Sequence, residues 1–163
     1  MKKLIIFSAI FLMLCTSCNT KENNDNKPER VDKYEGKSGK ITCVVENKTQ
    51  AFDFKGTYTI TYENGYVIDT YTREIMSLDN EDNVKAYVQK LTEEYKKYDG
   101  LEHYQYSVNQ NGLKIVNNTH IDYKNIDLLN LSETSGQVVT KESLKTSTIV
   151  ASYKILGAIC EEE

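Results

Sequence analysis

Hydrophobic and polar residues alternate along two segments of the chain, and each segment predicts a β-hairpin. From Thr57, tyrosine and isoleucine alternate with threonine until Asn64-Gly65, and apolar residues resume at Val67. Asn-Gly supplies the two positive-φ residues of a type I′ turn. The pattern repeats over residues 103–123 around Asn111-Gly112. We therefore expect two antiparallel strand pairs, preceded by an extended segment that contains Cys43.

The periodicity changes between the hairpins, where it predicts an amphipathic helix at about residues 80–98. Ser77 or Asp79 is expected to cap its start, and Gly100 to end it. Acidic residues near the start suit the positive end of the helix dipole. One face of this helix is apolar, and we expect it to be buried; its members are Val84, Tyr87, Val88, Leu91, Tyr95 and Tyr98.

The C-terminal third has a weaker pattern. Residues 125–136 have the pattern of a short turn of helix or an irregular crossing, and we expect them to form a loop. A second helix is expected from Thr140, although its threonine and valine content weakens the helical tendency. Its predicted buried face consists of Leu144, Thr148, Ala151 and Ile155. The order of elements predicts an α+β fold, with an antiparallel β-sheet built from hairpins and two helices packed on one face. This single domain is expected to span residues 40–163.

The first residues have the plan of an export signal. Lys2 and Lys3 precede an apolar segment from Leu4 to Leu14, whose helical rise of about 16 Å is short of the ~30 Å bilayer core. Ser17-Cys18 then has the order of a bacterial lipobox. We expect a signal peptide over residues 1–17, a lipid on Cys18 that anchors the chain to the membrane, and a polar tether over residues 18–39.

Cys15 and Cys18 have the C-x-x-C spacing of a redox pair or half a metal site. Such motifs lie within a folded domain, whereas this one ends a hydrophobic leader. An ordinary secretory cleavage is the other alternative to lipidation. The sequence departs from the usual lipobox at one position, because Cys15 stands where Leu, Val or Ile is usual.

Two cysteines remain for the folded domain. Cys43 lies near its start and Cys160 near its end. An exported chain meets a non-reducing environment, so an even pair favours a disulfide. The alternative is two separate buried thiols that behave as small hydrophobic residues.

The charge of the chain limits its partners. Loss of Lys2 and Lys3 with the leader would change the formal net charge from −4 to −6. Nucleic acid needs a basic surface, so we do not expect it as a partner. No cofactor motif is present, and no cofactor, metal site or catalytic residue is predicted.

Few residues are candidates for chemistry. His103 and His120 belong to no catalytic motif. The acidic run at residues 79–83 resembles the start of a calcium loop, but Val84 and Lys90 replace the required Gly and Glu. Helix capping accounts for this run better.

The chain has twelve tyrosines and no tryptophan. Most of them lie on the predicted helix face or at alternate strand positions, where we expect them to pack in the core. An exposed recognition surface would use remaining tyrosines such as Tyr66, Tyr71 or Tyr123.

The leader, the helix-to-strand passage EEYKKYDGLEHYQYSV and the cysteines near the domain ends together resemble the YehR-like bacterial lipoproteins, a family of uncharacterised function. The resemblance implies the fold, lipidation and an envelope location, and it carries over no catalytic residue. We expect a lipid-anchored, non-catalytic binding or accessory module of the cell envelope, with an unknown protein or small-molecule partner. The alternative is a structural or stress-response lipoprotein without a small-molecule ligand.

Overall fold

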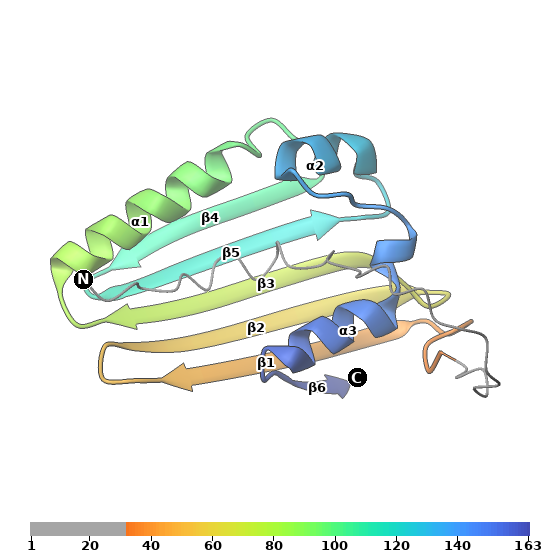
Figure 1. Ribbon diagram of the computed structural model, residues 1–163, viewed down its shortest axis with the longest axis horizontal. Helices are drawn as coiled ribbons and strands as arrows, with labels where there is room; N and C mark the ends of the chain where they lie inside the picture. Colours follow the sequence, from red (N-terminus) through yellow and green to blue (C-terminus); the bar gives the residue numbers. More distant parts are fainter. Residues whose placement is uncertain (1–31) are drawn as a thin grey trace, which may run out of the picture.

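The computed structural model describes residues 32–163, which form one six-stranded antiparallel sheet with helices (Figure 1). The strand order is β4-β5-β3-β2-β1-β6. The strands are β1 (Gly39–Lys48), β2 (Phe52–Glu63), β3 (Tyr66–Leu78), β4 (Tyr104–Asn111), β5 (Lys114–Asp122) and β6 (Ile159–Glu162). The helices are α1 (Glu81–Lys96), α2 (Leu128–Ser135), a 3-10 helix (Glu142–Leu144) and α3 (Thr146–Ile155). The predicted α+β fold class is confirmed.

Both predicted hairpins are present. β2 and β3 are joined by Asn64 and Gly65, which both have positive φ, as a type I′ turn requires. In the second hairpin, Asn111 pairs with Lys114, so the turn residues are Gly112 and Leu113 rather than Asn111-Gly112. Gly112 alone of these two has a positive φ.

The helix α1 forms where its apolar periodicity predicts, and Val84, Tyr87 and Leu91 are buried along it. The predicted cap is wrong by a residue or more. Asn80 is the N-cap, and its side-chain oxygen accepts a hydrogen bond from the backbone N–H of Asn83 at 2.9 Å. Asp79 supports the cap indirectly, because its carboxylate accepts from the side-chain amides of Asn80 and Asn83.

The helices α1 and α3 cover the same face of the sheet. The ring of Tyr153 on α3 lies 4.4 Å from that of Tyr58 on β2. The hydroxyl of Tyr95 on α1 lies 2.7 Å from the side-chain nitrogen of Asn117 on β5. Tyr58, Thr72 and Thr119 are successive partners across β2, β3 and β5, so both helices reach one continuous surface. The opposite face is the outer face of the sheet, with Tyr71 44% exposed.

Three C-terminal features differ from the sequence-based expectation. Residues 128–135 form the helix α2, capped by Asp127 and ended by Gly136 at φ 72°, where a loop was predicted. Residues 159–162 add the edge strand β6. Of the predicted buried face of the last helix, Leu144 is buried, but Thr148, Ala151 and Ile155 are exposed. Ile149 is buried instead, with 5% of its surface exposed against 84% for Ile155. A 3-10 turn before Thr146 resets the phase of the helix.

The residues just before the predicted domain start at residue 40 also pack against the domain. Tyr34 is buried, with its ring 5.4 Å from that of Tyr62. Asp32 accepts a hydrogen bond from the Ser147 hydroxyl at the start of α3. The predicted leader, Cys18 and most of the predicted tether lie outside the described residues. Within residues 32–163, no helix is long and apolar enough to span a membrane.

Candidate functional site

A polar strip interrupts the apolar core in the middle of the covered face. On β3 the inward positions before Met76 are Thr70, Thr72 and Glu74, and on β5 Asn117 and Thr119 lie between buried isoleucines. The three threonines and Asn117 are all buried. Buried polar side chains are uncommon at the centre of a core, where apolar residues pack better. This strip is therefore the strongest candidate for a functional site.

The register of the sheet places Glu74 between two neighbours, Gly56 on β2 and Asn117 on β5. A Cβ atom at Gly56 would lie 2.5 Å from the Tyr58 hydroxyl, so the absence of a side chain at residue 56 leaves room for that ring. The Tyr58 hydroxyl donates to Oε1 of Glu74 at 3.0 Å. From the other side, Nδ2 of Asn117 donates to Oε2 at 3.1 Å.

The helix α1 completes the strip through Tyr95. Its hydroxyl accepts from Nδ2 of Asn117 at 2.7 Å and from the Thr119 hydroxyl at 3.4 Å. Its ring stacks on Tyr106 of β4, with centroids 5.1 Å apart. Asn117 uses its nitrogen for both bonds, and its Oδ1 is buried without a hydrogen-bond partner among the described residues. The site therefore holds an acceptor that nothing in residues 32–163 satisfies.

Burial dominates the electrostatics of this site. It raises the pKa of Glu74 above its ordinary value, and the hydrogen bonds from Asn117 and Tyr58 offset only part of that effect. Burial and the Glu74 charge together raise the pKa of Tyr58, Tyr87, Tyr95 and Tyr153. These hydroxyls consequently stay neutral across the physiological pH range, and Glu74 is the carboxylic acid of this site, held toward its protonated form by burial.

The structure brings the two predicted disulfide partners together. Cys43 on β1 and Cys160 on β6 are directly opposite in the strand register, with their sulfur atoms at disulfide distance, 2.03 Å. Cys43 is fully buried and Cys160 is partly buried. Cys18, the predicted lipidation site, lies outside the described residues.

Most tyrosines pack in the core, as predicted. Tyr98 stacks on Tyr104 with centroids 4.3 Å apart, and both are buried. Of the three tyrosines predicted for a recognition surface, Tyr71 is exposed and Tyr66 is partly exposed. Tyr123 is buried, so its predicted role is wrong. It follows β5 and turns inward because the strand pairs regularly with β3 up to Asp122.

The remaining candidate residues form no cluster of catalytic or metal-binding groups. His120 lies 2.6 Å from Asp69, and His103 lies 3.6 Å from Asp122. Within residues 32–163, no three His, Cys, Asp or Glu side chains gather as a metal ion would need. The acidic run at residues 79–83 caps α1, which agrees with the capping interpretation.

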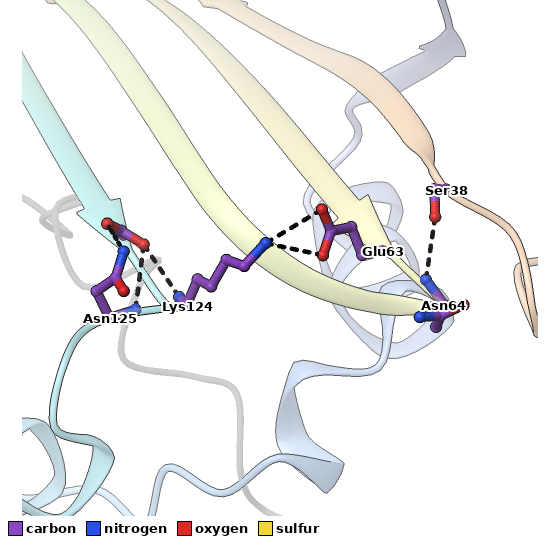
Figure 2. Close-up of polar contacts among 6 residues, drawn as sticks. Ser38, Glu63, Asn64, Lys124 and Asn125 are labelled. Atoms are coloured by element: carbon purple, nitrogen blue, oxygen red, sulfur yellow. Dashed lines mark hydrogen bonds and ion pairs between the residues drawn. The ribbon is translucent and has the colours of Figure 1, made fainter.

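A hollow of about 250 Å³ lies at the β2–β3 turn. It is lined by Asp32, Glu35, Asn64, Gly65, Tyr66 and Lys145. Next to it, Nζ of Lys124 reaches Glu63 at 3.1 Å, and Asn64 donates its backbone N–H to Ser38 (Figure 2). Lys145 pairs with Glu142 at 2.8 Å. Because the side chains of Asp32 and Lys145 already have partners, this hollow is a weaker candidate than the strip around Glu74.

Sequence reasoning did not find Glu74. The sequence did contain a signal for it. Glu74 falls at the same alternate positions as Thr70, Thr72 and Met76, which places a charged residue on the inward face of the strand. Reading that signal requires the strand register, which the sequence leaves open at the bulge between Thr61 and Tyr62.

Comparison with known proteins gives distant likenesses of fold. No family model and no curated protein sequence matches this chain. An NMR structure of a protein from Streptococcus pneumoniae TIGR4 is similar at 16% identity and a TM-score of 0.49, over 88% of this chain and 97% of that chain. The NMR structure of the E. coli YehR protein is similar at 13% identity and a TM-score of 0.49, over 73% of this chain and 88% of that one.

Proposed function

We propose that this protein is a lipid-anchored binding module of the bacterial cell envelope, akin to the YehR-like lipoproteins, and that it has no catalytic activity. Binding is supported by one observation above the others, the polar strip around Glu74. An ordinary core does not keep a carboxylate beside an unsatisfied buried amide oxygen, because each carries a desolvation cost. A ligand that contacts both groups would offset that cost.

The location is supported by the order of residues in the leader and by the cysteine pair. Cys18 follows a small residue at the end of an apolar segment, and a polar stretch comes next. Cys43 and Cys160 at disulfide distance suit an exported chain, since disulfides persist in oxidising compartments. Two acyl chains on Cys18 would give stable anchoring where one is marginal.

The anchor is tested by fractionating bacteria that express the full chain. The wild-type protein should partition with membranes and into the detergent phase, whereas Cys18→Ser should stay uncleaved or leave the lipid-modified fraction. The matched control is Cys15→Leu, which introduces a residue usual at that lipobox position and should partition like the wild type. A Cys18→Ser protein that is processed and fractionates like the wild type would refute the anchor.

A further inference from the structure

The Glu74 carboxylate has only neutral partners. Its two oxygens accept from the Tyr58 hydroxyl and the Asn117 amide. Among residues 32–163, no lysine, arginine or histidine forms an ion pair with Glu74. A desolvated carboxylate without a counter-charge is unstable relative to one that has a cation or a proton nearby. The described residues therefore supply no positive charge to Glu74.

The surroundings of Glu74 are aromatic. The Tyr58 hydroxyl on β2 donates to Glu74, and the Tyr95 hydroxyl on α1 accepts from Asn117, which itself donates to Glu74. The Tyr153 ring on α3 lies 4.4 Å from that of Tyr58, and the Glu74 charge also raises the pKa of Tyr87 on α1. The faces of aromatic rings attract weakly hydrated cations and hold them best when water is excluded. The buried Oδ1 of Asn117 adds an acceptor that lacks a donor. As whole residues Glu74 and Tyr95 are partly buried, so this group lies near the protein surface.

We propose that the tyrosine-lined strip around Glu74 binds the ammonium group of a small organic cation. The carboxylate supplies the counter-charge, the rings surround the nitrogen substituents, and Oδ1 of Asn117 accepts an N–H where the ammonium carries one. This inference rests on the proposed binding function and names its ligand class. A divalent metal fits less well, because no second carboxylate, histidine or cysteine joins Glu74 among the described residues.

A proton is the competing occupant, and pH separates the two. The titratable side chains coupled to Glu74 are tyrosines that stay neutral, Tyr58 from β2, Tyr87 and Tyr95 from α1 and Tyr153 from α3, and its partner Asn117 from β5 carries no charge. The affinity for a permanently charged cation should therefore rise with pH as Glu74 loses its proton. A site that takes only a proton would bind no cation at any pH.

The test is calorimetric titration of the full-length protein in mild detergent, at constant ionic strength, from about pH 5 to about pH 8. The probes are choline and n-butylammonium. The comparison ligand is 3,3-dimethylbutan-1-ol, which has the shape of choline without its charge. We expect both cations to bind at least about tenfold more tightly than the alcohol, a difference of ~1.4 kcal/mol.

Two variants sharpen the test. Glu74→Gln keeps the size of the side chain and removes its charge, so the affinity for both cations should fall at least about tenfold while the melting transition stays cooperative. Glu102→Gln changes an exposed glutamate elsewhere and should bind like the wild type. If Glu74→Gln fails to fold, the pH dependence of choline binding to the wild type decides the question alone.

Two results would overturn the inference. Equal affinity for choline and its alcohol analogue would make the strip a neutral apolar site, and no binding of either cation across the pH range would leave the proton as the occupant. Neither result bears on Cys18, whose fractionation test stands by itself. The proposed ligand class can therefore be refuted without refuting the lipid anchor, and the anchor without refuting the ligand class.

Discussion

Gly56 and Glu74 lie directly opposite each other on β2 and β3, and the Tyr58 hydroxyl occupies the space that a side chain at residue 56 would fill. This arrangement turns the tyrosine toward the carboxylate that it hydrogen bonds. A small residue on one strand thus sets the environment of a charge on the next. The contact gives the first prediction.

Gly56→Ala should destabilise the protein by about 1–3 kcal/mol, because the new methyl group displaces the Tyr58 ring. Urea unfolding measures the loss. The cost should shrink in a Tyr58→Phe background, which lacks the hydroxyl that lies closest to the methyl group. Gly100→Ala is the control: nothing lies within 4 Å of its Cβ position, so its cost, set by a φ of +83°, should be the same in both backgrounds. Full additivity of Gly56→Ala and Tyr58→Phe would contradict the contact.

Glu74 should make stability fall as pH rises. Its pKa is raised in the folded state, so the folded protein holds the proton more tightly than the unfolded chain does. The stabilisation is complete below about pH 4, near the ordinary glutamate pKa, and is lost as the pH rises through the raised value. Glu74→Gln mimics the protonated form, so it should be more stable than the wild type at about pH 8 and similar to it at about pH 4. The measurement is the denaturation midpoint against pH, without added amines, and parallel curves for the two proteins would sink the idea.

Cys43 and Cys160 should be recovered as one crosslinked peptide pair when the exported, non-reduced protein is digested and analysed by mass spectrometry. The sequence separation is 117 residues. Closing a loop of that length stabilises by about 4–5 kcal/mol in the chain-entropy model. The Cys43→Ala/Cys160→Ala protein should lose a comparable amount, and reduced wild type should approach it. Alkylation of both thiols in the native, non-reduced protein would rule out the bond.

The buried face of α3 can be tested with two isoleucines of the same helix. Ile149→Ala should cost about 2–5 kcal/mol, because Ile149 is 5% exposed and its loss leaves a cavity. Ile155→Ala removes the same atoms from a side chain that is 84% exposed, and it should change stability by less than about 0.5 kcal/mol. Equal effects in chemical denaturation would show that the helix is placed in the wrong phase.

Local patterns predicted those parts of the fold that local physics determines. The alternation around Asn64-Gly65 and the apolar face of α1 each carry their own signal, and both elements form where expected. The helix α2 was missed although Asp127 and Gly136 supply a cap and a left-handed stop. Its serines and asparagine favour turns, and packing of the buried Leu131 overrides that tendency.

Other features depend on contacts between distant residues. The strand β6 has four residues, too few for a periodic signal, and it forms by pairing with β1 across the cysteines. Glu74 enters the candidate site because β3 lies between β2 and β5, which brings Gly56 and Asn117 to its two sides. The sequence predicted strands but not their order in the sheet. It therefore could not predict that Gly56 and Asn117 would flank Glu74.

The link between β1 and β6 also determines how the protein responds to mechanical load. A force applied between residue 32 and the C-terminus would enter the domain through Asp32 and Tyr34 and would reach Cys43 near the start of the sheet. With the sulfur atoms bonded, tension passes directly to Cys160, so the intervening chain bears none of it. Only the short segments outside the two cysteines could lengthen, and the surface between α1 and α3 would keep its shape while the protein is pulled.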